Sequence, residues 1–555
     1  MPHAVNIATP GLQALILCGP GSSFPTFTAN PDENPKALLP IANRPMVWYP
    51  LDLCYRAGIT NITLVCPPSA APAIDTALKT NPFLTSLPFP RPDLLAPKDL
   101  DNNTGTAEIL RLPELQDVVK SDFLVLPCDL VCELGPEQLL QAWMVKSASL
   151  EDLVGDAQPQ GPPSGGLGVW YPTKTANPVK GEETDFLATV SLPDASAVLP
   201  PKSSLFPHLQ KVVYSIPTDS LKDLLDDKDG FPVRHGLLRQ HPRVRMLTTH
   251  RDAHIYIFPR WVMKFVKDNE RLESISEDII GWWAKASWQK GLSGKLGLDG
   301  SLERPAGGSS DGHSSPHGAG ATASSAQLGA GQSAAGAPDA DLSASLHNGD
   351  ESTSSPAPAA ASVPPLLAYI HPGAPEGPLI RRVDTSQLLL QVSLQLAKLP
   401  ALEDAAPDAP VSPFAHARKV AYPEGVKPRT TITRQDSLVG DNVTVQEKAS
   451  IKESVIGAGC QIGEGARLVQ CLLMDGVVVG KNCKLTKCIL GKRSEIGDGC
   501  VLTECEVQEN LLVEAKVEAK DEKFMSSSGL EASDHEMEDS DGGDDDGASG
   551  NEEHD

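Results

Sequence analysis

The chain has 555 residues, 11 cysteines and a formal net charge of −25 at pH 7. This length is enough for two or three domains, and the acidic balance argues against a broad surface that binds nucleic-acid phosphates. No segment reaches the ~18 apolar residues of a membrane-spanning helix, no basic signal region precedes the first apolar run, and no CxxC pair is present, so we expect a cytosolic protein with reduced thiols.

The N-terminal part alternates apolar runs with helical patterns. We expect strands at 12–18, 59–66 and 122–128, and helices at 46–58 (bent at Pro50), around 69–79 and from Pro136 onward. Strands that alternate with helices predict a parallel α/β sheet. Residues 1–300 are therefore assigned to one Rossmann-like α/β domain.

The next region carries further elements and an interruption. We expect a strand at 254–258 and an amphipathic helix at 275–288, with Ile279, Trp282, Trp283 and Ala286 on its apolar side. Residues 303–365 are rich in Gly, Ala, Ser and Pro, which predicts a disordered insertion. His250 and His254 flank the predicted strand on one face at roughly 13 Å, too far apart for one metal ion, and we expect no metal site.

Order is expected to return at 366–400, which continues the α/β domain. This part predicts a strand and then a helix over 384–399, capped by Asp384 or Ser386, whose apolar face is formed by Leu388, Leu389, Val392 and Leu396. Residues 401–430 are Pro-rich and are assigned to a linker.

A repeat occupies the C-terminal part of the chain. Aliphatic residues recur about every six residues, for example Ile456, Ile462 and Leu468, and are often followed by glycine. Short repeats of this kind build a parallel β-helix, in which each unit contributes one strand and one turn. We assign residues 436–515 to a left-handed β-helix of hexapeptide repeats, in which the cysteines are small core residues.

The end of the sequence is strongly acidic. The last 25 residues contain 12 Asp and Glu and no Lys or Arg. Such a composition cannot bury a core, so residues 525–555 are expected to be a disordered acidic tail.

Three motifs in the first domain are candidates for binding. The glycine-rich turn at Gly19 and Gly21 lets backbone N–H groups approach phosphates, and Lys36 can neutralise their charge. TGTAE (104–108) supplies Gly105 and Thr106, and the strand LVLPC ends at Asp129, where a carboxylate at the mouth of the sheet can hold Mg²⁺.

In order and spacing, these motifs resemble the nucleotidyltransferase-like domain of the sugar-nucleotide pyrophosphorylases over roughly residues 12–290. That family carries an Arg shortly after the glycines, which binds the triphosphate. Here GPGSSF (19–24) is followed by no Arg before Lys36. Because a guanidinium is hard to replace, the resemblance implies that the fold is kept and that catalysis is lost.

A second resemblance covers more of the chain. NRPMVWYPLDLCYRAGI (43–59), RDAHIYIF (251–258), SVIGAGCQIG (454–463) and CLLMDGVVVG (471–480) are similar to the gamma subunit of eukaryotic translation initiation factor 2B. The resemblance implies a non-catalytic subunit that pairs with epsilon, docks on the alpha, beta and delta subunits, and contributes to guanine-nucleotide exchange on initiation factor 2. It implies no cofactor, no membrane and no direct nucleic-acid contact. Outward-facing aliphatic residues in 468–480 are expected to contact epsilon.

Two other interpretations remain open. The chain is an active nucleotidyltransferase that makes a sugar nucleotide, with Gly19, Gly21, Lys36 and Asp129 around triphosphate and Mg²⁺. Alternatively, the same pocket, with Gly105 and Thr106, binds a nucleotide without turning it over.

Overall fold

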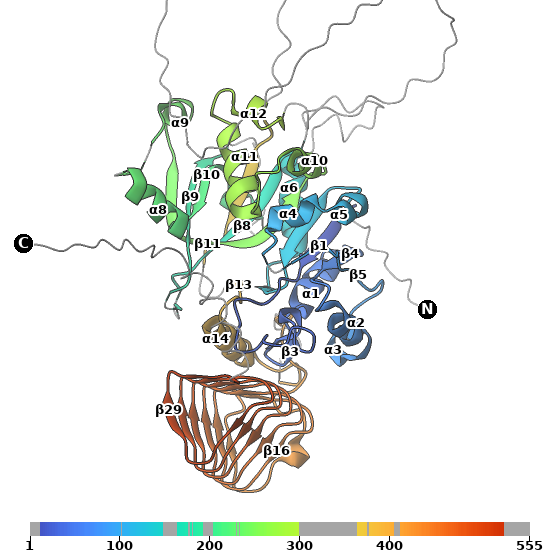
Figure 1. The fold of residues 1–555 in the computed structure, drawn as a ribbon, viewed down its shortest axis with the longest axis vertical. Coiled ribbons are helices and arrows are strands. Elements are labelled where there is room, and N and C mark those ends of the chain that lie inside the picture. Colours follow the sequence, from blue (N-terminus) through green and yellow to red (C-terminus); the bar gives the residue numbers. More distant parts are fainter. Residues whose placement is uncertain are drawn as a thin grey trace, which may run out of the picture.

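The computed structural model describes residues 11–101, 103–147, 164–175, 178–179, 181–192, 204–228, 230–231, 233–298, 363–373, 377–404 and 411–526. Within them, an α/β domain sits on a triangular prism of short strands (Figure 1). The predicted insertion, up to residue 362, and the predicted tail, beyond residue 526, lie outside the described residues.

The α/β domain is built on a nine-stranded sheet with the order β5-β4-β1-β6-β11-β8-β12-β10-β9. Strands β5, β4, β1 and β6 run parallel, whereas β11 is antiparallel to β6, β8 and β9. The sheet is therefore mixed, and the expected parallel arrangement holds for its N-terminal half. The strands are β1 (Gln13–Leu17), β4 (Asn61–Val65), β5 (Asp93–Leu95), β6 (Phe123–Pro127), β8 (Gly166–Pro172), β9 (Asp185–Ser191), β10 (Leu209–Pro217), β11 (Arg245–Phe258) and β12 (Leu366–Ile370).

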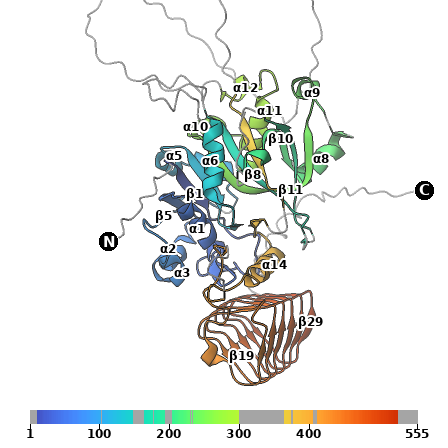
Figure 2. The ribbon, with the colours of Figure 1, turned by 180° about the vertical axis from the view of Figure 1, so that it is seen from behind.

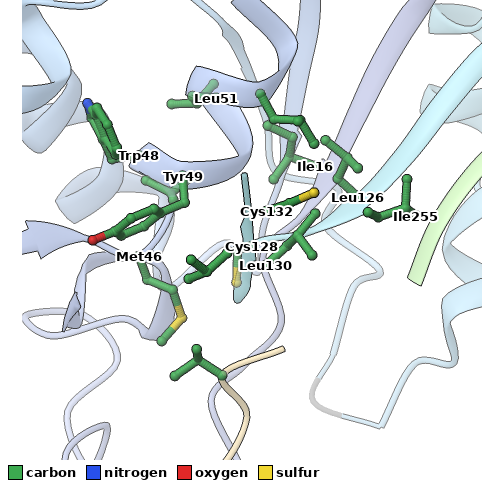
Figure 3. Close-up of a cluster of buried hydrophobic side chains, with 14 of the residues drawn as sticks. Ile16, Met46, Trp48, Tyr49, Leu51, Leu126, Cys128, Leu130, Cys132 and Ile255 are labelled. Carbon is green, nitrogen blue, oxygen red and sulfur yellow. The ribbon is translucent and has the colours of Figure 1, made fainter. Parts of the chain in front are cut away.

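Helices cover both faces of this sheet because successive strand residues point to opposite sides. Ile16 belongs to the core on one face, and Leu15 belongs to the core on the other. The helices are α1 (Trp48–Arg56), α2 (Ala71–Thr80), α3 (Pro82–Thr85), α4 (Thr106–Arg111), α5 (Pro113–Val118), α6 (Pro136–Ser147), α8 (Thr218–Lys228), α9 (His235–Gln240), α10 (Trp261–Asp268), α11 (Ile280–Ala286), α12 (Leu292–Lys295) and α14 (Ser386–Ala397). Figure 3 shows part of the first core, where Ile16 and Leu126 gather beside Leu51 of α1.

Smaller elements complete the domain. Two short pairs join β2 (Pro40–Ile41) to β3 (Arg44–Pro45) and β7 (Leu130–Cys132) to β13 (Ile380–Arg382). One-turn helices lie at Lys36–Leu38, Phe206–His208 and Pro423–Gly425.

Three helix predictions need correction. The first helix begins at Trp48, so Pro50 falls in its first turn, where proline is tolerated and causes no bend. The predicted helix at 275–288 is a π-helical turn (Ile275–Ile279) followed by α11, and Trp282 is 38 % exposed instead of lying on the apolar side. The cap of α14 is Thr385, whose hydroxyl accepts the Leu388 N–H, and not Asp384 or Ser386.

The prism consists of three parallel sheets of short strands. Their strands are β14 (Thr431–Ile432), β17 (Ser450–Lys452), β20 (Arg467–Val469), β23 (Lys484–Thr486), β26 (Val501–Thr503) and β29 (Glu518–Lys520); β15 (Leu438–Val439), β18 (Val455–Ile456), β21 (Leu472–Leu473), β24 (Ile489–Leu490), β27 (Glu506–Val507) and β30 (Lys523–Phe524); and β16 (Thr444–Val445), β19 (Gln461–Ile462), β22 (Val478–Val479), β25 (Glu495–Ile496) and β28 (Leu512–Val513). Strands of the repeat thus lie outside the predicted 436–515 range on both sides. Val420 and Val426, from the predicted linker, also pair with coil residues.

From β15 onward, each coil of the prism contains 17 residues, because strand residues pair with partners 17 positions later. The first turn is longer, since Thr431 pairs with Ser450, 19 positions later. Three hexapeptides would give about 18, so one edge of each 17-residue coil is one residue shorter than the sequence pattern predicts. Left-handed residues mark the corners, among them Asn482, Lys487 and Arg493. All eleven cysteines are free and buried, and the six in the coils line the prism core, as expected.

One face of the prism packs against the α/β domain. Its outward positions Leu438, Val455, Leu472 and Ile489 are buried in the same core as Ile16. Helix α14 lies between the two parts in both views (Figures 1 and 2) and contacts β18 and β21. The side chain of Asn43 donates to the Ile456 carbonyl at 2.8 Å. The expected partner contact of the aliphatic residues in 468–480 is therefore wrong for Leu472, which faces the chain's own domain.

Candidate functional site

The site lies where parallel strands end. Asp129 follows β6, and β7 after it pairs with β13, which puts Arg382 opposite Leu130. The Val383 N–H donates to the Asp129 carbonyl at 2.8 Å, so the backbone holds the two segments in register. Arg382 is thereby brought beside Asp129 from more than 250 residues later in the chain.

Asp129 is enclosed by two cations. Its side chain is 2 % exposed, and its Oδ2 accepts a hydrogen bond from the Lys36 ammonium at 2.8 Å. The Arg382 Nε lies 3.9 Å from Oδ1. Among the described residues, Asp129 Oδ1 and Arg382 Nε make no hydrogen bond, so the second cation acts through charge.

Asp129, Lys36 and Arg382, here called the triad, stabilise one another's charged forms. Burial by itself would raise the pKa of Asp129, but Lys36 and then Arg382 outweigh it and hold that pKa well below its usual value. Burial would likewise lower the pKa of Lys36, and the Asp129 carboxylate raises it instead. Asp129 is therefore an ionised carboxylate whose charge is already compensated within the protein.

A second group of charges surrounds the triad. Arg251 contacts the Asp384 carboxylate at 2.5 Å and Glu183 at 3.4 Å, and Arg382 Nη2 lies 3.4 Å from Asp384. Arg382 Nη1 also lies 3.1 Å from His254 Nε2. Burial and then the nearby Arg382 hold the pKa of His254 well below its usual value, so the ring is neutral and Nε2 accepts this bond.

The position of His254 reflects an irregular strand. Strand β11 shifts register between Asp252 and Tyr256, and His254 has a φ of 52°. Such a bulge breaks the alternation of side chains. The expectation that His250 and His254 share one face of a regular strand is therefore wrong, and His254 joins the polar cluster by itself.

Two carboxyl groups meet next to this bulge. The Asp252 N–H donates to Asp185 Oδ2 at 2.5 Å, and the Tyr256 hydroxyl donates to Asp252 Oδ2 at 2.5 Å. Burial, followed by the mutual repulsion of the two carboxylates, raises the pKa of Asp252 to about 7. Burial also raises the pKa of Asp185, to about 6.

The glycine-rich loop has one constrained glycine. Gly21 has a φ of 96°, and a Cβ there would lie 2.9 Å from the Thr28 side chain, whose hydroxyl donates to the Gly21 carbonyl at 2.8 Å. A Cβ at Gly19 would meet no atom within 4 Å. Gly19 touches the site through its backbone N–H, which faces the Cys128 sulfur.

Gly105 and Thr106 pack against the chain itself. A Cβ on Gly105 would lie 2.2 Å from the Glu273 carbonyl oxygen. The Ala107 N–H donates to that oxygen at 2.8 Å, and the Thr106 hydroxyl accepts the Ile275 N–H at 2.9 Å. The start of α4 is thus engaged by residues 273–275, a contact that explains this glycine without a ligand.

The residues around Asp129 do not fit a magnesium site. Mg²⁺ prefers several oxygen ligands and water, whereas the oxygens of Asp129 face an ammonium and a guanidinium. Within the described ranges, no group of three His, Cys, Asp or Glu side chains can hold a metal ion.

Arg251, Arg382 and Asp384 are not among the site residues predicted from the sequence. The family pattern places a guanidinium only between Gly19 and Lys36. The signal that was available is RRVD (381–384), a charged run at the start of the predicted helix 384–399.

Comparisons with known proteins match both parts of the chain. A nucleotidyl transferase family model matches residues 30–169, and a model described as the EIF2B subunit epsilon LbH domain, a left-handed β-helix, matches residues 422–519. These matches confirm the predicted fold class. Among the described residues, no helix has the length and apolar character to span a membrane.

Two curated relatives carry the same name. The chain is 27 % identical over 293 residues to the translation initiation factor eIF2B subunit gamma of Schizosaccharomyces pombe, a match of 53 % of this chain and 55 % of the relative. It is 22 % identical over 270 residues to the subunit of that name from Caenorhabditis elegans, covering 48 % and 57 %. The resemblance to the gamma subunit is confirmed, and the chain spans about half the length of the curated relatives it matches.

Proposed function

We propose that this chain is a subunit of the translation initiation factor 2B guanine-nucleotide exchange complex. In this proposal it pairs with the epsilon subunit, joins the alpha, beta and delta subunits, and contributes to GDP/GTP exchange on initiation factor 2 in the cytosol. The observation that carries the proposal is the similarity over 293 residues to a relative named as the gamma subunit.

We further infer that the chain performs no nucleotidyl transfer. The support is local: the carboxylate at the mouth of the sheet, Asp129, is already paired with Lys36 and faces Arg382. A triphosphate would have to displace these contacts before Lys36 could bind it. The α4 amide at Ala107 is also occupied, by the Glu273 carbonyl.

The prism suits a subunit whose role is positional. One face is used by the chain's own α/β domain. On a second face, formed by the sheet that contains β22 and β28, Val478 is half-buried and Leu512 is 64 % exposed among the described residues. An exposed aliphatic residue beside stacked strands is a feature of assembly surfaces. Because Leu472 packs against the α/β domain, we place the expected contact with a partner on the prism faces that do not touch that domain.

The test is affinity purification of the full chain from its native cell, followed by identification of the proteins that co-elute. We expect the epsilon subunit first and the other subunits with it. A Lys79→Ala variant is the matched control, because it breaks only an exposed ion pair with Asp75, and it is expected to co-elute equally well. Recovery of the chain without any of these proteins would contradict the proposal.

The loss of catalysis is tested separately. We expect no release of pyrophosphate from GTP or ATP with a panel of sugar 1-phosphates. We also expect no change in Tm with about 1 mM GTP, GDP or a sugar nucleotide, a concentration near the upper end of typical KM values. Turnover that Asp129→Asn abolishes would restore the enzyme interpretation. A thermal shift without turnover would instead support the nucleotide-sensing pocket.

A further inference from the structure

The α/β domain has a groove whose lining includes none of the charged residues around Asp129. It has a volume of about 1170 Å³ and is lined by residues of α8, α9, β9–β11, α11, α12 and the end of α10. Figure 1 shows where these elements lie in the domain. This volume is larger than that of most small-molecule sites, which hold about 300–1,000 Å³. Its size is suited to a length of polypeptide.

The walls of the groove are apolar and aromatic. Phe186, Tyr214 and Phe231 form a cluster with ring centroids 5.0–5.9 Å apart. Two further lining residues are exposed, Met246 at 48 % and Trp282 at 38 %. Exposed apolar side chains that line one groove mark an interaction site.

The rim of the groove is cationic in a protein of net charge −25. Its lining contains six basic residues and three acidic ones: Arg234, Lys267, Arg271, Lys285, Lys290 and Lys295, against Asp268, Glu270 and Asp278. Asp278 is already held by the N–H groups of Glu273 and Ser274. Five of the cations, all but Lys285, form no ion pair with another described residue. The groove therefore favours an acidic segment that also carries apolar side chains.

The chain itself contains such a segment close at hand. The stretch 299–362 leaves the structure at Leu298 and re-enters at Val363. Leu296 lines the groove, and the Trp283 indole, next to Trp282, donates to the Pro364 carbonyl at 2.8 Å. The stretch therefore leaves the described chain after α12, at the groove, and returns next to the buried Trp283 of α11, whose neighbour Trp282 lines the groove.

The composition of this stretch matches the groove at one place. Residues 299–362 contain seven Asp and Glu against a single Arg, and four of these acids cluster around Leu342 and Leu346 in DADLSASLHNGDE (339–351). Seventeen residues separate Leu346 from Val363, a span of roughly 55 Å when extended. The acidic tail 531–555 has the charge, but its only large aliphatic residue is Met537.

We propose that residues 339–351 of this chain dock in the groove. Leu342 and Leu346 pack against the aromatic wall, and the four flanking carboxylates lie on the cationic rim. Apolar anchors placed in a groove, with charged flanks on its edge, are a recurrent mode of peptide recognition. The proposal concerns a different surface from the proposed function, so its failure leaves that function untouched.

The test is zero-length carbodiimide coupling, which joins a carboxylate to an amine in contact with it, on the full-length chain at low concentration. We expect crosslinks from Lys267, Lys290 or Lys295 to Asp339, Asp341, Asp350 or Glu351, within the monomer band, identified by peptide mapping. The double substitution Leu342→Ser/Leu346→Ser is expected to reduce these crosslinks at least fivefold. Leu328→Ser is the matched control, because Leu328 lies in the same stretch with no acid within five residues, and it is expected to change nothing.

Exchanging the charges of the groove and of the segment gives a second test, in case the leucine substitutions reduce the crosslinks without changing the docking. Because the exchange replaces carboxylates with lysines and lysines with glutamates, the coupled pairs remain available in the swapped chain. Lys290→Glu/Lys295→Glu alone should remove the crosslinks at those positions, and adding Asp339→Lys/Asp341→Lys should restore them. Crosslinks from the groove lysines to residues 531–555, crosslinks found only between two chains, or yields unaffected by the Leu342 and Leu346 changes would each overturn the proposal.

Discussion

Asp129 illustrates how a residue can keep its place in a fold while its chemical surroundings change. At the end of a parallel strand, a carboxylate normally faces a ligand pocket. Here a strand that follows the insertion places Arg382 at 3.9 Å, and Lys36 donates to the carboxylate at 2.8 Å. The carboxylate is thus held as part of a buried ion cluster, and each member leaves an uncompensated charge if another is removed.

The buried ion cluster predicts the effect of removing Arg382. Arg382→Leu should lower the free energy of unfolding by about 3 kcal/mol, because Asp129 and Asp384 both lose a neighbouring cation in a buried setting. Urea unfolding measures this change. Lys79→Ala is the control, since it breaks an exposed pair with Asp75 and should cost less than about 0.5 kcal/mol. Equal costs for the two variants would show that the cluster contributes no more than a surface pair.

The Asp185–Asp252 pair predicts a pH dependence of stability. The pKa of Asp252 is raised to about 7 in the folded protein, so the folded state binds more protons than the unfolded state between pH 5 and 7. The contribution of the pair to stability is therefore present at low pH and decreases as pH rises through that window. The decrease should be on the order of 2 kcal/mol.

Asp252→Asn separates this effect from other titrating groups. The difference in unfolding free energy between wild type and variant should change in favour of the variant as pH rises from 5 to 8. Asp129, whose pKa is lowered, does not contribute there, because its carboxylate is ionised in both states above about pH 5. A difference that stays constant with pH would show that the two carboxyl groups do not share this shift.

At the scale of elements, the prism uses one face to attach to the α/β domain. Leu472 and Val478 both point outward from neighbouring strands of one coil, but Leu472 is fully buried against the α/β domain and Val478 is only half-buried. A lysine placed at each of the two positions therefore tests whether the face that carries Leu472 is the one packed against the α/β domain.

Leu472→Lys is expected to destabilise the chain by about 3 kcal/mol, because an ammonium replaces an aliphatic side chain in a closed apolar contact. Val478→Lys should lie within about 0.5 kcal/mol of wild type. Urea unfolding measures both, and limited proteolysis near residues 411–430 should be faster for Leu472→Lys alone. Equal behaviour would contradict the assignment of this face as the internal interface.

Some secondary-structure elements could be predicted from the sequence, and others could not. The apolar runs that become β1, β4 and β6 could be predicted because each is short, continuous and bounded by turn residues. The coils could be predicted from their aliphatic repeat. Their length of 17 residues was also present in the spacing of Ile451 and Leu468, which pair in the structure, but a six-residue pattern conceals a shorter edge.

The candidate site was less accessible from the sequence. Lys36 and Asp129 belong to recognisable motifs, whereas Arg382 reaches them through the pairing of β13 with β7 across an insertion. Neither periodicity nor composition encodes that pairing. The roles of Gly105 and Thr106 depend on the approach of residues 273–275, which is likewise a property of the folded chain.

At the scale of the whole molecule, the two parts share one core. Leu438, Val455 and Leu472 of the prism belong to the same buried cluster as Ile16 of the central sheet. Polar contacts add to this junction, as Thr26 donates to Glu506 at 2.9 Å and Arg493 lies 3.4 Å from Glu33. A subunit that positions partners benefits from such a junction, because the direction of the prism is fixed by the domain above it.

A shared core predicts cooperative unfolding of the two parts. Domains joined only by a linker unfold independently, and their calorimetric enthalpy exceeds the van't Hoff enthalpy. Here the prism face and α14 would expose apolar surface if either part unfolded alone, so we expect one transition with a ratio of the two enthalpies near 1. Leu472→Lys should divide it into two transitions, because the shared cluster is broken while each part keeps its own core. Two well-separated transitions in the wild-type chain would show that the junction does not couple the prism to the domain.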